Sequence, residues 1–252
     1  MEIVYCRRMT IPVVLSDIQA FFDQWAPAEL AASWDNVGIQ IGAKGGEISE
    51  CLVSLEVDEQ VLAYLEGKTT VAVITHHPLF FKSLKRIDYN TDMGQIISAF
   101  VKGEHALFSA HTNLDAAEDG VNDCLIESFG LDPKIGVVME DGFGKYIESP
   151  NITYQDLLKK NGGIAQGAIH NEPIKRLGFC AGSGHGLIGS VLSLGCDTFV
   201  TGEVTYHDHV TCRMNGVRLI TLGHKESENM IVDRIATRMR NMFKDLEVTA
   251  LK

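Results

Sequence analysis

The sequence predicts an α/β protein of two lobes, each built on a mainly parallel sheet. Short apolar segments rich in β-branched residues alternate with amphipathic helical segments on both sides of an irregular stretch at 133–173. This alternation is typical of parallel sheets covered by helices. Polar clusters follow five of the predicted strands. Functional groups of such sheets gather beyond the carboxyl ends of the strands, so these clusters predict a site there.

The composition is that of an ordinary globular protein with an acidic balance. The chain has 252 residues, of which 45% are hydrophobic and 22% charged. This length suffices for one large domain or two small ones. The net charge of −11 argues against a broad basic face for nucleic acid. An anionic substrate would therefore need local positive charge, which a metal ion could supply.

The distribution of apolar residues and cysteines predicts a cytoplasmic protein. No apolar run reaches the ~18 residues that a membrane span needs, and the N-terminus lacks the apolar core of a secretory signal. The six cysteines form no C-x-x-C pair and are scattered through predicted core segments. We therefore expect reduced thiols rather than a disulfide framework or a thiolate metal cluster.

The first predicted element is a helix at 16–25. Its apolar residues, most of them aromatic, recur at helical spacing and are typical of a core-facing stripe. Ser16 and Gln19 have the spacing of a capping box, and Pro27 follows the helix end. Residues 33–42 then predict a glycine-marked loop that leads into a short strand.

A βαβ unit follows. It consists of a strand at 51–57, a helix at 58–66 that Asp58 caps, and a buried strand within residues 70–81. This second strand is apolar and rich in β-branched residues without an interrupting charge, which suits a strand covered on both faces.

The buried strand ends in two adjacent histidines, His76 and His77. Pro78 favours an extended backbone at His77 and so limits the directions in which the rings can point. The alternative is a turn that carries two surface histidines. Because the strand lies between two helical segments, we predict an inner strand of a parallel sheet, with both imidazoles at its functional edge.

The same pattern repeats once more in the first lobe. An amphipathic helix at 92–102 precedes a short apolar strand at 106–110. The motif H-T-N-L-D, with His111 and Asp115, stands directly beyond this strand, and a further helix is expected at 121–129.

Weak periodicity at 133–173 predicts a change of lobe, with domains at 1–132 and 133–252. The second lobe again shows three strands followed by polar turns: C-A-G-S-G, T-G-E and G-H-K-E-S-E. A long final helix follows, and its apolar stripe could also pack on the first lobe.

The residue types at the strand ends predict a metal site. Imidazole and carboxylate groups together suit zinc, manganese, iron, cobalt or nickel, and the sequence does not distinguish among these metals. Five such groups exceed the roughly three protein ligands of one catalytic ion, so we predict two divalent ions about 3.5–4 Å apart. The candidate ligands are His76, His77, Asp115, His224 and Glu228.

Six motifs together resemble one family. They are W-D-N-x-G-x-Q-x-G at 34–42, T-H-H-P at 75–78, H-T-N-L-D at 111–115, C-x-G-x-G at 180–184, T-G-E at 201–203 and G-H-x-x-x-E at 223–228. In this order they resemble the Ngg-interacting-factor family, whose members are often labelled GTP cyclohydrolase I type 2 homologues. The motifs span most of the chain.

The resemblance implies a role for each matching position. The family's two-metal ligands fall on the five residues named above, and Glu228 matches the carboxylate that touches both ions. His111 matches a histidine near the site, which either carries a proton or only positions Asp115. The resemblance also implies two interlinked lobes and a toroidal homohexamer with its sites facing the cavity.

Several polar groups near the strand ends keep two interpretations. Glu203, which follows the T-G strand end, is either a catalytic base or a cap of the next segment. The C-A-G-S-G turn either holds an anion or is only a tight connection. The same ambiguity, site or solvated surface, applies to Lys82, Lys85, His185, His207 and His209.

The leading functional hypothesis is a dinuclear-metal hydrolase that acts on a small anionic, nucleotide-like substrate. The alternative is a metal-binding ring that handles ions or regulates partners without turnover. A third possibility, a ring around DNA, is disfavoured by the net charge of −11.

Overall fold

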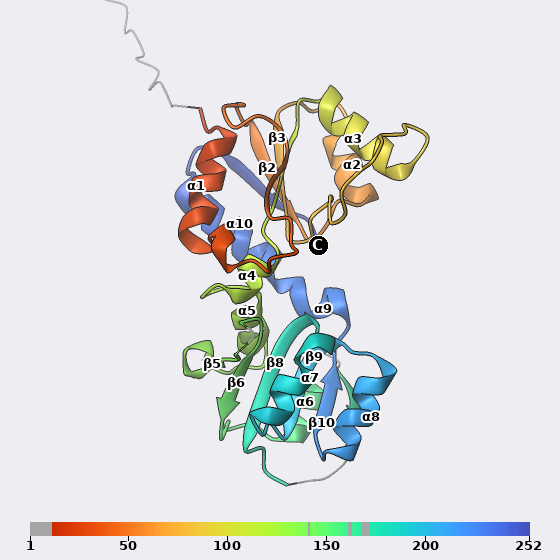
Figure 1. Cartoon of the computed structure of the whole chain (residues 1–252). Coiled ribbons are helices and arrows are strands. Elements are labelled where there is room, and N and C mark those ends of the chain that lie inside the picture. Colours follow the sequence, from red (N-terminus) through yellow and green to blue (C-terminus); the bar gives the residue numbers. More distant parts are fainter. Residues whose placement is uncertain (1–11, 141, 161–162, 168–171) are drawn as a thin grey trace, which may run out of the picture.

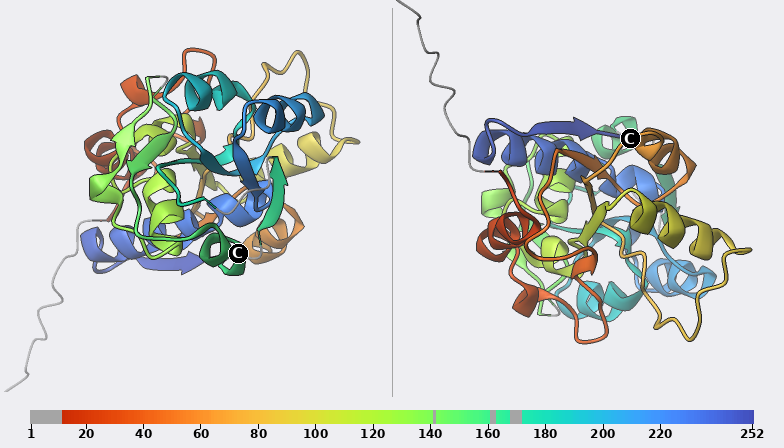
Figure 2. Two further views of the ribbon diagram at one scale, coloured as in Figure 1. Left: turned by 90° about the horizontal axis from the view of Figure 1, so that it is seen from below. Right: turned by 90° about the horizontal axis from the view of Figure 1, so that it is seen from above.

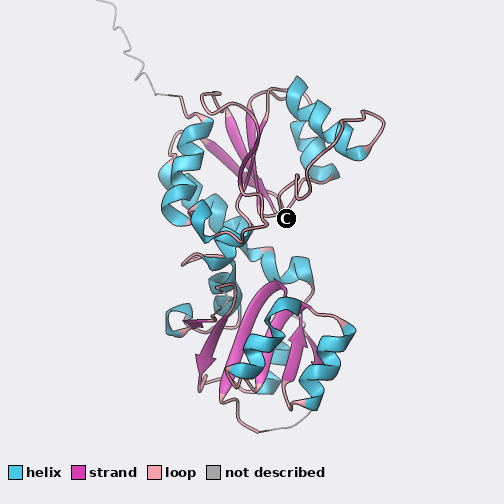
Figure 3. Cartoon of the chain, in the orientation of Figure 1, coloured by secondary structure: helices cyan, strands magenta, loops and turns pink. Residues whose placement is uncertain are grey.

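The computed structural model describes residues 12–140, 142–160, 163–167 and 172–252. These residues form two α/β lobes stacked end to end, each with its own sheet (Figure 1). Helices flank both sheets (Figure 3). The predicted two-lobed α/β fold is therefore confirmed.

The first sheet has five strands, of which four are parallel. The edge strand β1 pairs antiparallel with its neighbour, and the last strand of the chain closes the opposite edge. The chain thus returns to the first lobe after building the second. In spatial order the strands are β1 (Gly38–Ile41), β4 (Ala106–Ser109), β3 (Val71–Thr75), β2 (Glu50–Ser54) and β11 (Glu247–Ala250).

Both faces of this sheet are covered. Successive residues of a strand point to opposite faces. Ile74 accordingly packs in a cluster with Phe22 and Ile235, whereas Val73 packs with Phe100. Seen from above, α1 (Leu15–Trp25) and α10 (Met230–Met242) lie on one side of the sheet, and α2 (Glu59–Leu65) and α3 (Asp92–Lys102) on the other (Figure 2).

The second sheet has a parallel centre and antiparallel edges. Strands β8 (Arg176–Ser183), β9 (Thr198–Glu203) and β10 (Arg218–Thr221) run parallel. Strands β6 (Lys145–Glu148) and β7 (Ile164–Gly167) flank them in antiparallel orientation, and β5 (Val137–Val138) pairs antiparallel with β6. The flanking strands come from the stretch that showed weak periodicity.

Short helices complete the lobes and their junction. At the junction lie α4 (Thr112–Ala116), α5 (Val121–Ser128) and α9 (His224–Glu228) (Figure 1). The second lobe carries α6 (Tyr154–Lys159), α7 (Ile188–Ser193) and α8 (Tyr206–Met214). Three 3₁₀ turns occupy Ala28–Leu30, Pro133–Ile135 and His185–Leu187.

Two local predictions are wrong. The N-cap of α1 is Val14, and not Ser16, because the Asp17 carboxylate accepts the Val14 N–H at 2.9 Å. The Ser16 N–H instead donates to the carbonyl of Lys44. The segment G-H-K-E-S-E, predicted as a polar turn, contains a short helix of its own: α9 ends at Glu228, and the long final helix α10 begins at Met230.

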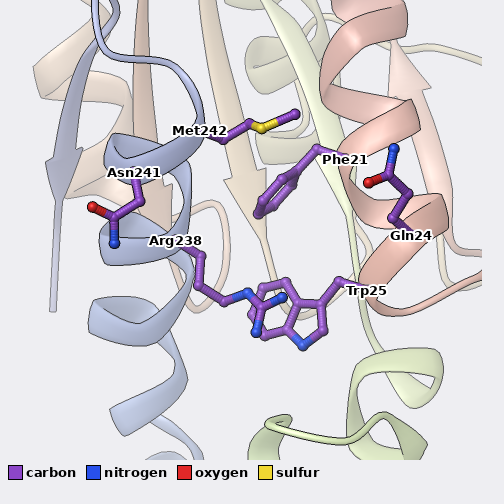
Figure 4. A pocket seen from close by; sticks show the side chains of 6 residues that line it. All are labelled: Phe21, Gln24, Trp25, Arg238, Asn241 and Met242. Atoms are coloured by element: carbon purple, nitrogen blue, oxygen red, sulfur yellow. The ribbon is translucent and has the colours of Figure 1, made fainter.

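A hollow of about 460 Å³ lies between α1 and α10 (Figure 4). The Arg238 guanidinium lies over the Trp25 ring, 4.1 Å from its centroid, and also pairs with Asp119. Arg238, the charged residue of this lining, therefore already has two partners in the first lobe. We interpret the hollow as part of the packing between α1 and α10.

The thiols agree with the expectation of a reduced protein. Cys51, Cys124, Cys180, Cys196 and Cys212 are buried and form no disulfide, whereas Cys6 lies outside the described residues. Among the described helices, none has the length and apolar character required to cross a membrane.

Candidate metal centre

Strand ends of both lobes meet at one pocket. His76 and His77 directly follow β3, and Asp115 lies on α4 just beyond β4. From the second lobe, β10 leads through Gly223 into α9, which carries His224 and Glu228. The pocket has a volume of about 670 Å³ and is lined from both lobes. The structure therefore brings together all five predicted ligand residues.

The Glu228 carboxylate lies at the centre of this group. Its Oε2 is 3.1 Å from Nε2 of His77 and 3.4 Å from Nε2 of His224. Its Oε1 instead lies 3.8 Å from Nε2 of His76. The side chain is only 5% exposed. One buried carboxylate thus presents each of its oxygens to a different set of imidazole nitrogens.

His76 and Asp115 leave two buried atoms without a hydrogen bond. The His76 ring donates its Nδ1–H to the Ala110 carbonyl at 2.8 Å, so Nε2 of the neutral ring carries a lone pair. This Nε2 lies 3.6 Å from Oδ1 of Asp115, and among the described residues neither atom has a hydrogen-bond partner. Such orphaned atoms cost about 1–3 kcal/mol each. A cation between them would satisfy both.

The spacing of the other ligand atoms also fits a metal. Two ligands that lie about 2.1 Å from one ion are separated by about 3.0–3.4 Å at ordinary coordination angles. The distances from Glu228 to His77 and His224, 3.1 and 3.4 Å, fall in this range. A second group of nitrogens within 4.8 Å of one another joins His76, His77 and His111.

Partners behind the rings fix three of the histidines. His111 donates its Nδ1–H to Asp35, 3.0 Å from both carboxylate oxygens. His224 donates its Nδ1–H to Glu203 at 3.0 Å, and His76 donates its Nδ1–H to the Ala110 carbonyl. Histidines that bind metals are commonly oriented in this way. Glu203 therefore contacts the ring of His224 on the side away from Glu228.

Asp35 is a site residue that the sequence interpretation gave no role. Its side chain is fully buried and accepts hydrogen bonds from His111 and from the Thr112 backbone and hydroxyl. Burial opposes its charge, but the bonds from His111 and Thr112 prevail and hold the pKa of Asp35 well below its usual range. This aspartate belongs to the W-D-N motif. Because it lies in a loop, its hydrogen bond with His111 was not predictable from the sequence.

The electrostatics of the centre also favour a bound cation. Burial disfavours a charged His76 ring, yet the Asp115 and Glu228 carboxylates outweigh it and raise the pKa of His76 to about 9. Burial likewise opposes the Glu228 charge, but His76 and His77 hold the pKa of this carboxyl well below its usual range. Burial raises the pKa of Asp115. The two carboxylates thus favour positive charge at Nε2 of His76, which either a proton or a metal ion can supply.

The C-A-G-S-G segment, predicted as a turn, forms the irregular end of β8, and its central glycine has a steric reason. Gly182 has a φ of +62°, and a Cβ there would lie 2.1 Å from Oε1 of Glu228. The Gly182 N–H donates to the Ser227 hydroxyl at 2.8 Å, one residue before that carboxylate. This end of β8 therefore supports the position of Glu228.

Gly182→Ala should reduce the bound metal of the purified protein, because the new methyl group must displace the Glu228 carboxylate. Strain at the positive φ should also lower the free energy of unfolding by about 1–2 kcal/mol. Gly186→Ala is the matched control, since Gly186 lines the same pocket and has no atom within 4 Å of the added Cβ. Equal metal content in the two variants would contradict this role for Gly182.

The remaining polar candidates lie outside the group of ligands. His185 donates its Nδ1–H to Asp208 at 2.7 Å, away from the candidate ligands. On α8, His207 is exposed and His209 is half-buried, and neither joins a candidate metal group of the described residues. Lys82 and Lys85 are exposed in the segment that follows the two histidines.

Known proteins resemble this chain over nearly all of its length. A GTP cyclohydrolase 1 type 2 homolog of Campylobacter jejuni is 33% identical over 246 residues, which cover 94% of this chain and 97% of that protein. The protein named GTP cyclohydrolase 1 type 2 of Helicobacter pylori is 30% identical over 222 residues, covering 85% of this chain and 87% of that protein.

Solved structures share the fold at lower identity. A hypothetical protein of Staphylococcus aureus superposes with a TM-score of 0.83 at 24% identity, covering 96% of this chain and 97% of that one. Reduced HcgD from Methanocaldococcus jannaschii gives a TM-score of 0.82 at 21% identity, with 96% and 99% covered. The family model described as Duf34/NIF3 (NGG1p interacting factor 3) matches residues 13–252, and the chain therefore belongs to this family.

Proposed function

We propose that this protein is a dinuclear-metal hydrolase that acts on a small anionic, nucleotide-like substrate. The observation that carries the proposal is the buried Glu228 carboxylate, whose two oxygens face different imidazole nitrogens. The unpaired atoms of His76 and Asp115 support a cation on one side. The name of the Helicobacter relative, GTP cyclohydrolase 1 type 2, supports a nucleotide as the substrate class.

The residues divide into two ligand sets. His76 and Asp115 would hold one ion together with Oε1 of Glu228, and His77 and His224 would hold the other together with Oε2. When bound, the two ions would polarise the electrophilic carbon or phosphorus centre and lower the pKa of a water nucleophile. The ring centroids of His76 and His77 are 5.1 Å apart, so the two ligand sets are adjacent.

His111 is the proposed proton carrier. Asp35 holds its Nδ1–H, so that the Nε2 lone pair of the neutral ring remains available. The ring centroid of His111 lies 5.1 Å from that of His76 and 5.7 Å from that of His77. His111 can therefore accept a proton beside the ligand sets, as a general base does. Glu203, bonded to the far side of His224, would position that ring and not act as a base.

Metal analysis and turnover test the proposal together. Protein purified without chelator should contain close to two equivalents of divalent metal, and chelator treatment should abolish hydrolysis in a panel of nucleotides and other anionic metabolites. His76→Ala should lower the metal content because it removes the buried Nε2 that faces Asp115 and Glu228. A reproducible value near one equivalent, unchanged in His76→Ala, would defeat the two-metal assignment.

The alternative, metal handling without turnover, has one observation in its favour. The side chains of His77 and His224 are 24% and 38% exposed, whereas that of His76 is fully buried. One half of the centre is therefore open toward the pocket, and an ion there could exchange more easily. Rapid transfer of one metal equivalent to a chelator, with no turnover of any compound in the panel, would favour this alternative.

We also propose a homohexameric ring, on family resemblance alone. Light scattering at micromolar concentration should then give six times the chain mass of 27.7 kDa. A mass equal to that of one chain would rule the ring out.

A further inference from the structure

Two large aromatic side chains are exposed at the wall of the metal pocket. Trp34 is 62% exposed and Phe81 is 53% exposed, and both line the pocket beside His77 and Glu228. Their ring centroids are 5.6 Å apart at an angle of 60°. Isolated apolar residues are common on protein surfaces. Here, in contrast, two aromatic side chains from segments far apart in the sequence meet at the wall of a pocket. The fold itself therefore creates this exposed aromatic surface.

The His111 ring lies between this aromatic pair and the candidate metal ligands. The centroid of the His111 ring lies 6.2 Å from that of Trp34 and 6.4 Å from that of Phe81. The same ring lies 5.1 Å from His76 by the same measure. A flat molecule that stacks on the pair would consequently lie next to the proposed proton carrier and the candidate ligands.

Hydrogen bonds hold the two segments that carry the pair. The Asn36 side-chain amide donates to the Phe80 carbonyl at 2.8 Å, and the Phe80 N–H donates to Oε1 of Gln40 at 3.2 Å. Gln40 in turn donates to the Asn36 carbonyl at 2.8 Å. Asp35, next to the tryptophan, is anchored by Thr112. The rings are thus exposed on a fixed backbone, which reduces the entropy cost of binding a ligand.

The rest of the lining defines what would fit. Phe143 and Leu187 line the pocket from the second lobe, so that it has apolar sides as well as polar groups. Its volume of about 670 Å³ lies within the range of about 300–1,000 Å³ that is usual for small-molecule sites. Aromatic side chains bind flat π-systems of many kinds by stacking, with little sequence or substituent preference.

We propose that Trp34 and Phe81 bind a planar heteroaromatic ring of the substrate, of the size of a nucleobase, by stacking. This inference rests on the proposed function, because it places the reacting group of the same molecule at the metal centre. Stacking of the substrate's ring supplies affinity and orientation. The metal ligands and His111 act on the anionic or electrophilic part of the same substrate. Trp34 and Phe81 are thereby substrate-binding residues that select for a planar ring but not for its substituents.

Calorimetric titration of the metal-loaded protein tests the inference with two matched probes. GMP contains a purine ring, and ribose 5-phosphate is the corresponding compound without it. Trp34→Ala and Phe81→Ala should each weaken GMP binding by about 5- to 150-fold, the range measured for loss of one base–aromatic stack. Trp34→Phe should retain most of the affinity. Binding of ribose 5-phosphate should change by less than about twofold in all three variants, since it cannot stack.

Tyr206→Ala is the control for loss of an exposed aromatic residue. Tyr206 is 75% exposed on α8 and outside the pocket lining, so GMP affinity should not change. The inference is overturned by unchanged GMP affinity in Trp34→Ala, or by no detectable GMP binding to the wild type at millimolar concentration. It is also overturned if Trp34→Ala lowers the mass in light scattering without changing GMP affinity, because a second copy would then cover the pair.

The inference and the proposed function can fail separately. Stack-dependent GMP binding without turnover of any nucleotide would retain the ring-binding role and remove the hydrolase. Turnover of a substrate whose kcat and KM are the same in Trp34→Ala and the wild type would retain the hydrolase and remove the ring-binding role.

Discussion

Glu228→Gln should empty both metal positions together while the protein stays folded. Glutamine has nearly the same volume, but it removes the negative charge and replaces one carboxylate oxygen by an amide nitrogen that cannot bind a cation. Each oxygen of Glu228 faces a different ligand set, so neither proposed ion keeps its full coordination. The following helix is anchored by fully buried Ile231, Ile235 and Met239, so the backbone should hold.

The contrast with a terminal ligand makes this prediction specific. His77→Ala should preferentially empty the position shared with His224, because the other side of Glu228 faces His76 and Asp115. Anomalous diffraction at a metal absorption edge would report the two occupancies separately. Retention of both ions in Glu228→Gln, or loss of only one, would require the bridging role to be abandoned.

The arrangement of the candidate ligands was predictable because strand ends are informative. In a parallel sheet every strand delivers its last residue to the same edge, so polar residues after β3 and β4 had to gather at one edge of the first sheet, and those after β8, β9 and β10 at one edge of the second. Strong β-branched runs located these strands. The sequence therefore predicted which groups meet without showing how the two lobes would face each other.

Partners contributed by loops and weak elements could not be predicted in this way. Asp35 lies in an irregular segment, and nothing in its spacing relates it to His111, 76 residues later. Trp34 was recognised only as part of a motif. Its exposure at the pocket was not predictable, because the exposure of an aromatic side chain depends on the tertiary structure. The strand β11 is four residues long, and its pairing with β2 depends on the path of the whole chain. Such pairings arise from packing and not from local propensity.

Asp35→Asn should lower the proposed hydrolytic turnover about 10- to 100-fold, the usual cost of losing a group that orients a site residue. The asparagine oxygen can keep the two bonds from Thr112, but its amide then faces Nδ1 of His111 and donates to it. His111 must accept at Nδ1 and carry its proton on Nε2. The ring therefore loses the lone pair with which it would accept a proton.

Two measurements and two comparison variants separate this positioning role from a general loss of structure. Nitrogen NMR of the imidazole rings should show the change of tautomer at His111, and metal content should stay near that of the wild type. Asp58→Asn is the control for the same substitution: Asp58 caps α2, a position at which asparagine serves equally well. Asp115→Asn, in contrast, should lose metal, because it weakens a predicted ligand.

A double-mutant cycle gives the decisive comparison. If Asp35 acts on turnover only through His111, the pair Asp35→Asn and His111→Ala should be no slower than His111→Ala alone, since residues that act as a unit are not additive. Additive losses would show that Asp35 contributes through another route, such as the Thr112 segment that it anchors. If His111→Ala loses more metal than Asp115→Ala, His111 is itself a ligand, and its nitrogen, which lies within 4.8 Å of those of His76 and His77, binds an ion instead of a proton.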